Sequence, residues 1–269
     1  MPDPSALASA LPPVLVDIPS AIERACRVQI QAGQHGTLTK AAAEALVDGR
    51  EVVRSFRTLS TLPLDRVTPL IRHVYTQSVC WALFTSEYFD SLGRLIKRLT
   101  DHRGGSTRVL EVCAGSGVMV KPMRERGIEW TGTDASPPSA TLSDVTVRTA
   151  LTAVQEAVGI DVVFFAWWSK PRQNKRRHGK SSLRELDDTG DAALPEDRRL
   201  VDFCVAHGIP VVFVSENEGG ITGSPELWHG DYQVQPAKDV AGEDFVDVTN
   251  WVGFSDRTWV ILPSQSVIS

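Results

Sequence analysis

The apolar positions of this chain change their spacing near residue 107. From residue 20 to residue 100 they recur at the three- and four-residue spacing of amphipathic helices. The clearest helical set is Phe89, Leu92, Leu95, Ile96 and Leu99. Thr85 or Ser86 suits the start of that helix as a cap, and the glycine pair at 104–105 suits its end. The pattern predicts a helical extension over residues 20–104.

After residue 107, short apolar runs alternate with helical stretches. Four segments predict strands of a parallel sheet: Val109–Cys113, Glu129–Thr133, Asp161–Ala166 and Ile209–Val214. The first of them is a short apolar run that is typical of a buried parallel strand. Two stretches between them predict helices at Val118–Arg126 and Leu200–His207. This alternation indicates an α/β fold with a doubly wound, mainly parallel sheet. Near the end, an antiparallel hairpin is predicted from Phe245–Val252 and Thr258–Leu262.

These elements divide the chain into a tail, a helical cover and one α/β domain. Residues 1–19 contain a Pro-Pro pair and no Lys or Arg, so they predict a disordered tail rather than a signal peptide. The α/β domain covers residues 105–269 and contains a polar insertion at 170–198. A basic run from Lys170 to Lys180 opens that insertion, and an acidic run follows. A lid or a flexible insertion is the favoured interpretation, with contact to RNA or an acidic peptide as the alternative.

Net charge and cysteine usage exclude several kinds of protein. A formal net charge of -5 argues against a surface coated with basic residues for nucleic acid. The four cysteines, Cys26, Cys80, Cys113 and Cys204, form no C-x-x-C pair, so neither a disulfide framework nor a zinc site is expected. This use of cysteine favours a reducing, cytoplasmic location. No apolar run is long enough to cross a bilayer, so no membrane partner is expected.

A glycine turn after the first predicted strand is the strongest chemical signal. The run from Glu111 to Gly117, Glu-Val-Cys-Ala-Gly-Ser-Gly, stands between a strand and a helix, where doubly wound sheets bind ligands. A dinucleotide fingerprint needs a third small residue where Met119-Val120 stands, so a nicotinamide cofactor is disfavoured. An acidic residue at the start of the turn suits a cation. We therefore expect Glu111 to face the amine and sulfonium of S-adenosylmethionine.

Asp134 supplies the second signal, because it ends the next predicted strand. A carboxylate there can accept both hydroxyls of a ribose. The alternative is an ordinary aspartate that caps the end of a strand.

At these residues the chain resembles the class I S-adenosylmethionine-dependent methyltransferases, over roughly residues 85–262. The run to Gly117 looks like the family's first motif, with Cys113 where glycine is usual, and Asp134 looks like its ribose-binding residue. A poorly characterised branch of the fold is indicated by Val214–Gly223 and by Trp167-Trp168. The resemblance implies S-adenosyl-L-methionine as cofactor. It implies as cofactor-binding residues Glu111, Cys113, Ala114, Gly115, Ser116, Gly117, Asp134, Ala135, Ala150, Leu151 and Ala166.

Candidate substrate residues follow the third and fourth predicted strands or lie in the helical cover. Trp167 and Trp168 could form a wall for a flat or cationic acceptor, although one of them could equally be core. Glu216 could orient an amine or act as a base, and a capping or solvated role is the alternative. From the cover, Tyr88 is the first candidate among Tyr75, Trp81, Phe84 and Tyr88, although a core stripe is the simpler interpretation of this set. His229 is interpreted as a surface histidine.

The leading hypothesis is a methyltransferase that acts on a small molecule, such as a natural-product intermediate, at oxygen or nitrogen. The alternatives are a methyltransferase of RNA or a modified peptide, a cofactor-binding scaffold without transfer activity, and an oxidoreductase. The sequence leaves the oligomeric state open.

Overall fold

The computed structural model describes residues 40–45, 72, 75–76, 79–101, 105–138, 141–168, 194–218, 220, 222–250 and 254–263. The chain has two compact units, Met1–Val79 and Cys80–Ser269. In the first unit, helix α2 spans Lys40–Ala45 and buries Ala42 and Ala43. The predicted tail and most of the predicted extension and insertion lie outside the described residues.

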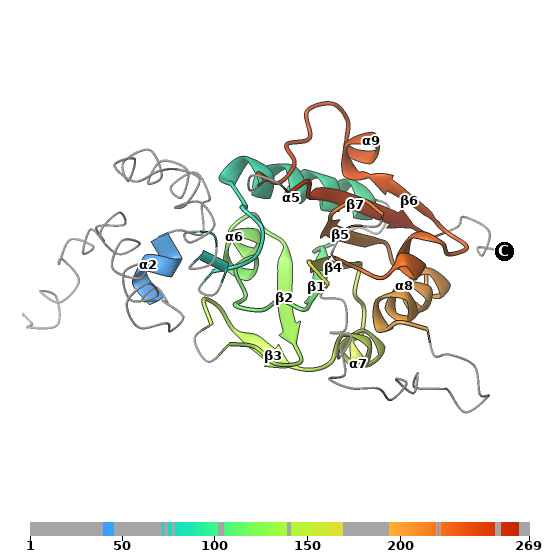
Figure 1. Ribbon diagram of the computed structural model, residues 1–269, viewed down its shortest axis with the longest axis horizontal. Coiled ribbons are helices and arrows are strands. Elements are labelled where there is room, and N and C mark those ends of the chain that lie inside the picture. Colours follow the sequence, from blue (N-terminus) through green and yellow to red (C-terminus); the bar gives the residue numbers. More distant parts are fainter. Residues whose placement is uncertain are drawn as a thin grey trace, which may run out of the picture. The chain divides into compact units, whose positions relative to one another are not determined.

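The second unit is built on a seven-stranded sheet with the order β3-β2-β1-β4-β5-β7-β6 (Figure 1). Five strands run parallel: β1 (Arg108–Val112), β2 (Glu129–Asp134), β3 (Val145–Val147), β4 (Val162–Ala166) and β5 (Val211–Ser215). Strand β7 (Arg257–Leu262) runs antiparallel to both β5 and β6 (Gln233–Pro236). The predicted fold class, a mainly parallel α/β sheet with antiparallel strands at its carboxyl end, is confirmed.

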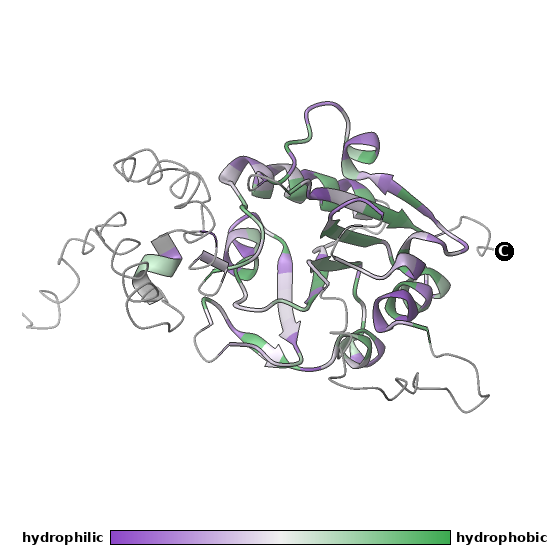
Figure 2. Ribbon diagram, viewed as in Figure 1, coloured by the Kyte–Doolittle hydropathy of each residue, from purple (hydrophilic) through white to green (hydrophobic). Residues whose placement is uncertain are grey.

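Helices cover both faces of this sheet. The described helices of this unit are α5 (Ser86–Thr100), α6 (Val120–Arg124), α7 (Ala150–Glu156), α8 (Glu196–Ala206) and α9 (Ala237–Ala241), with the 3-10 turn η3 at Pro225–Trp228. Helices α5 and α9 lie on one side of the sheet and α7 and α8 on the other, as Figure 1 shows. Figure 2 shows that α5 and α8 are apolar on one side and polar on the other. Within the described residues, no helix has the length and apolarity that crossing a membrane requires.

Strand β4 is apolar throughout and β5 is apolar up to its last residue, because both faces of these central strands are covered. On the side of α7 and α8, Leu110, Val112, Phe165 and Phe213 belong to one core cluster that Leu200 of α8 joins. Since side chains alternate along a strand, Glu111 lies on the opposite face. Helix α5 begins as predicted, with the Thr85 hydroxyl accepting from the backbone N–H of Tyr88.

The C-terminal hairpin forms, but its first strand is not Phe245–Val252, so this part of the prediction is wrong. Strand β6 lies earlier in the chain, and the described part of the predicted strand has a single isolated bridge, between Thr249 and Leu83. The reason is local packing. The Phe245 ring contacts Tyr88 of α5 edge-on, and Val246 donates its N–H to Ser91. This segment therefore covers α5 instead of extending the sheet.

Candidate functional site

The glycine turn closes at the carboxyl end of β1 through three left-handed residues. Cys113, Gly115 and Gly117 have φ values of 56°, 53° and 75°. A side chain at Gly117 would meet Val145 at 2.8 Å, whereas the space beside the Cα of Gly115 is open to 4 Å. The turn therefore leaves room for a ligand at Gly115 and excludes side chains at Gly117. Cys113 adopts the conformation that glycine prefers, at a cost of about 1–2 kcal/mol.

Asp134 ties this turn to the end of β2. Its Oδ2 accepts from the Gly115 N–H at 2.9 Å, and its Oδ1 accepts from the Ser136 N–H at 2.7 Å. The Ala114 N–H donates to the Thr133 carbonyl at 2.9 Å, which holds the same two segments together. Each carboxylate oxygen can accept more than one hydrogen bond, so half-buried Asp134 keeps capacity for ribose hydroxyls. The structure thus brings the two strongest sequence signals into direct contact.

Glu111 points into the protein, on the face of β1 opposite the core cluster of α7 and α8. Its side chain is 3% exposed, and its Oε2 accepts from Trp130 Nε1 at 2.7 Å. Burial raises the pKa of the Glu111 carboxyl to about 8; the Trp130 bond lowers it and the charge of Asp134 raises it further. A carboxyl with this pKa is largely protonated at neutral pH. The predicted contact between a Glu111 anion and a cationic cofactor stays a prediction.

The start of α7 lies beside Asp134 at the same edge. Strand β3 pairs Val147 with Asp134, and the Arg148 N–H donates to the Asp134 carbonyl at 3.0 Å. Thr149 then caps α7, whose first residues are Ala150, which is buried, and Leu151, which is half-buried. Ala150 and Leu151, both predicted to bind the cofactor, are therefore close in sequence to a segment that is bonded to the predicted ribose residue Asp134. Ala135 is exposed and directly follows Asp134. Half-buried Ala166 ends β4, which pairs with β1, the strand that leads into the glycine turn.

Trp167, the first residue after β4, combines two unfavourable features. Its φ is 60°, in the left-handed region, and its side chain is 7% exposed with an indole nitrogen that has no hydrogen-bond partner among the described residues. The backbone costs about 1–2 kcal/mol and an unpaired buried donor about 1–3 kcal/mol. Such costs concentrate at functional sites. The ring stacks on Trp81 at 5.7 Å and lies 6.0 Å from the ring of Phe254.

Trp168 and Tyr88 occupy core positions. The Trp168 ring is 7% exposed, contacts Phe165 edge-on at 5.4 Å and belongs to the core cluster of α7 and α8. Tyr88 is fully buried and stacks on Phe84 at 5.2 Å, and burial raises its pKa. The substrate roles predicted for both residues stay predictions, and contact with an acceptor would require these rings to move. Of the tryptophan pair, Trp168 is the core member.

The loop after β5 carries Glu216 and is held by hydroxyl contacts. The Ser215 and Thr222 hydroxyls lie 2.8 Å apart, and the Glu216 N–H donates to the Thr222 hydroxyl at 3.1 Å. A side chain at Gly220 would meet the Glu216 carboxylate at 2.7 Å, so Glu216 folds back over its own loop. Its predicted role as a base stays a prediction. His229 is exposed, as predicted, and its Nε2 lies 2.7 Å from the Glu218 carboxylate, a pairing that the sequence did not reveal.

Sequence reasoning missed Asp197, which anchors this loop. It was assigned to the acidic run of the 170–198 insertion, but α8 begins at Glu196 and Asp197 is 1% exposed. Its carboxylate accepts from the N–H groups of Ser224, at 2.5 Å, and Arg198, at 2.9 Å. The signal was present, because proline followed by two acidic residues is typical of the start of a helix. The basic run Lys170–Lys180 lies outside the described residues.

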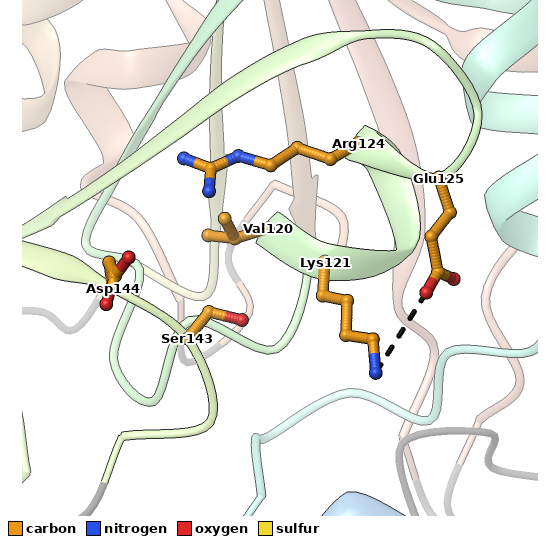
Figure 3. Close-up of a pocket in the computed structure, with 6 residues that line it drawn as sticks. All are labelled: Val120, Lys121, Arg124, Glu125, Ser143 and Asp144. Atoms are coloured by element: carbon orange, nitrogen blue, oxygen red, sulfur yellow. Dashed lines mark ion pairs between the residues drawn. The ribbon is translucent and has the colours of Figure 1, made fainter. Parts of the chain in front are cut away.

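A pocket of about 430 Å³ lies beside α6, and none of its lining residues belongs to the predicted site (Figure 3). It is lined by Val120, Lys121, Arg124, Glu125, Ser143 and Asp144. Lys121 and Glu125 form an exposed ion pair at 4.0 Å, and Arg124 donates to the Trp130 carbonyl at 2.8 Å. Its charges are thus largely engaged with one another or with backbone. Within the described residues, no group of acidic, histidine or cysteine side chains could hold a metal ion.

No protein-family model and no curated protein matches the sequence. By fold, 74 chains of solved structures match. The bifunctional kinase-methyltransferase WbdD is 11% identical with a TM-score of 0.43 over 67% of this chain, which spans 40% of that protein's length.

Two other matches cover most of both chains. Magnesium protoporphyrin IX methyltransferase from Synechocystis PCC 6803, with S-adenosylmethionine bound, is 9% identical with a TM-score of 0.39 over 84% of this chain and 97% of its own. The plantazolicin methyltransferase BpumL, in complex with S-adenosylhomocysteine, is 11% identical with a TM-score of 0.36 over 91% and 100%. The strand order of this chain, with β7 antiparallel to its neighbours, is that of the class I methyltransferase fold.

Proposed function

We propose that this protein is an S-adenosylmethionine-dependent methyltransferase whose acceptor is a small molecule methylated at oxygen or nitrogen. The observation that carries the proposal is the bond from the Gly115 N–H to the Asp134 carboxylate. It joins a glycine turn, open beside Gly115, to the acidic end of the neighbouring strand, at the sheet edge where this fold class binds ligands.

The chain's own residues divide the binding of such a cofactor among three segments. The Asp134 carboxylate accepts hydrogen bonds from the ribose hydroxyls. The turn from Cys113 to Gly117 brings the backbone close to the aminoacyl end of the cofactor. Ala150 and Leu151 provide an apolar wall for the adenine. When bound, S-adenosylmethionine supplies a methyl group already activated by its sulfonium. The protein then mainly aligns the acceptor and excludes water.

The acceptor side of the proposal depends on Trp167, which follows the strand next to the glycine turn. Small-molecule acceptors are favoured over RNA because the aromatic residues gather here, whereas the basic run is the one feature that favours RNA. Salt-sensitive binding of an RNA oligonucleotide would support the alternative. A cytoplasmic location stays a prediction from cysteine usage.

Titration calorimetry tests the cofactor assignment. We expect S-adenosylhomocysteine to bind and a nicotinamide dinucleotide to give no heat. Asp134→Asn keeps the shape of the side chain but removes its charge. Its affinity for S-adenosylhomocysteine should fall by roughly 10- to 150-fold, which corresponds to the free energy of a charge-assisted hydrogen bond. Asp144→Asn is the matched control, because exposed Asp144 lines the pocket beside α6.

Two results would contradict the proposal. Unchanged affinity in Asp134→Asn would remove the ribose assignment. Binding of the dinucleotide without binding of S-adenosylhomocysteine would indicate an oxidoreductase. If S-adenosylhomocysteine binds but no methylated product forms with any extract of small molecules or RNA, the scaffold alternative gains support.

A further inference from the structure

Three aromatic rings from distant segments meet at the carboxyl edge of the sheet. Trp81 precedes α5, Trp167 follows β4, and Phe254 precedes β7. The Trp81 and Trp167 rings stack with 26° between their planes, and the Phe254 ring is tilted by 41° to Trp167. Trp167 therefore has one aromatic neighbour on each of two segments that are remote from it in sequence.

The hydrogen-bonding group of Trp167 is not satisfied by these neighbours. Its Nε1 is buried and, within the described part of the chain, no residue accepts from it. An indole has one N–H donor and no acceptor, so Trp81 cannot provide what Trp167 lacks, and neither can the ring of Phe254. By contrast, Trp130 donates to Glu111 and Trp259 donates to the Ser215 carbonyl.

The two covering rings differ in exposure. Trp81 is 45% exposed, whereas Phe254 is half-buried. Trp81 belongs to a short segment that is bound to the rest of this unit through the bond from the Thr249 N–H to the Leu83 carbonyl. The stack shows that the face of Trp167 accepts a flat bicyclic ring, and the exposure of Trp81 means that this ring is the more readily exchanged.

We propose that a neutral, planar aromatic molecule bearing an oxygen displaces the Trp81 ring from Trp167, and that its oxygen accepts the hydrogen bond from Trp167 Nε1. This inference rests on the proposed function, because it makes the aromatic molecule the methyl acceptor. The exchange keeps the ring stack and adds the missing hydrogen bond. A phenol meets both requirements and can also be methylated: its oxygen bonds to the methyl carbon as the carbon–sulfur bond of the sulfonium breaks, S-adenosylhomocysteine leaves, and the phenolic proton passes to solvent.

The same reasoning disfavours a cationic acceptor. An ammonium group offers only donors and a quaternary ammonium offers neither donor nor acceptor, so both would leave the Trp167 N–H unpaired. A saturated ring with a hydroxyl could accept the hydrogen bond but could not replace the flat stack. Planarity and a hydrogen-bond acceptor are therefore both required.

The test uses the indole N–H signals of the full-length, ¹⁵N-labelled protein, which has seven tryptophans. The probe is 2-naphthol, and Trp167→Phe identifies the Trp167 signal. We expect 2-naphthol to move this signal downfield in a saturable way. The signals of Trp130 and Trp259, whose N–H groups already have partners, should stay in place.

Two substitutions should act in opposite directions. Trp81→Ala removes the competing ring and should tighten 2-naphthol binding by roughly two- to tenfold. Trp167→Phe keeps a flat ring but removes the donor, and should weaken binding by a similar roughly two- to tenfold. Val147→Ala is the control, because Val147 is an exposed apolar residue on β3. Trp81 is 45% exposed, and an unchanged far-UV circular dichroism spectrum of Trp81→Ala checks that the fold is intact.

The inference is overturned by any of four results. These are no saturable shift of the Trp167 signal, weaker binding in Trp81→Ala, an equal shift with decahydro-2-naphthol, and equal affinity for naphthyltrimethylammonium. S-adenosylhomocysteine is titrated into the same sample. If it binds while 2-naphthol fails, only the aromatic site is refuted. If 2-naphthol behaves as expected while S-adenosylhomocysteine does not bind, the methyltransferase proposal falls and the aromatic site stands.

Discussion

Glu111 should make the folded protein less stable as the pH rises. Burial of the carboxyl, which is 3% exposed, raises its pKa to about 8, from 4.5 for an ordinary glutamate. Between these two values the folded protein keeps a proton that the unfolded chain has lost, so the free energy of unfolding falls with rising pH. The stabilising contribution is complete below about pH 4.5 and is lost as the pH passes about 8.

The size of this effect follows from the two pKa values. Their difference of about 3.5 (8 minus 4.5) corresponds to about 5 kcal/mol, at about 1.4 kcal/mol for each unit of pKa. This is a large share of the stability of an ordinary domain. Because the group is buried, solvent does not screen the effect as it would at the surface.

Urea unfolding followed by far-UV circular dichroism, at about pH 5 and about pH 9, measures this contribution. Glu111→Gln keeps an acceptor for Trp130 but cannot ionise. The unfolding free energy of the unmodified protein, minus that of the variant, should fall by about 4 kcal/mol between the two pH values, because about 3 of the 3.5 units between the two pKa values lie above pH 5. Glu125→Gln, at an exposed position, should follow the unmodified protein at both.

A difference that stays constant within about 1 kcal/mol would refute the reasoning, because it would mean that the folded protein tolerates the Glu111 anion. Trp130→Phe provides a second check. The Trp130 bond lowers the pKa of Glu111, so its removal should raise that pKa and steepen the loss of stability above neutral pH.

Three further predictions concern neighbouring positions. Cys113→Gly should raise the free energy of unfolding in urea by up to about 1 kcal/mol, since φ there is 56°. A fall of more than about 1 kcal/mol in that free energy would contradict the assigned backbone strain. Asp197→Ala should cost about 2–3 kcal/mol and speed hydrogen exchange at Ser224, which loses its acceptor; unchanged exchange would refute the anchoring role. Tyr88→Phe removes a hydroxyl 3.3 Å from the Thr258 hydroxyl and should lower the free energy of unfolding by about 1 kcal/mol, while leaving the KM for the acceptor unchanged. A raised KM for the acceptor would restore Tyr88 as a substrate residue.

The sequence predicted the elements that are buried on both faces. Strands β1, β4 and β5 were found because a covered parallel strand needs a continuous or nearly continuous apolar run. Strand β2, Glu-Trp-Thr-Gly-Thr-Asp, was also predicted, although most of its residues are polar. Strand β3, Val145–Val147, was not found, because it is three residues long and lies at the sheet edge with two exposed side chains. Helix α7 was missed with it, since a seven-residue helix has too few turns for a periodic pattern.

The site was predictable only where a motif is local in sequence. The glycine turn and Asp134 are each readable alone, and their contact follows from parallel strands ending at one edge. The group of Trp81, Trp167 and Phe254 has no local signature, because its members belong to three segments that only the folded chain brings together. Glu111 points inward because of the face of β1 that it occupies. The predicted contact between Glu111 and a cationic cofactor did not consider which face that is.

A neutral acid beneath the glycine turn also bears on how the charge of a ligand is sensed there. The charge of Asp134 already raises the pKa of Glu111, so this side chain responds to charges at the turn. A sulfonium ligand would lower that pKa and expel the proton, whereas a thioether ligand would leave the proton in place. Uptake of the charged form would then be coupled to proton release and would strengthen in alkaline solution. One buried side chain would then let the protein bind a sulfonium more tightly than the matching thioether.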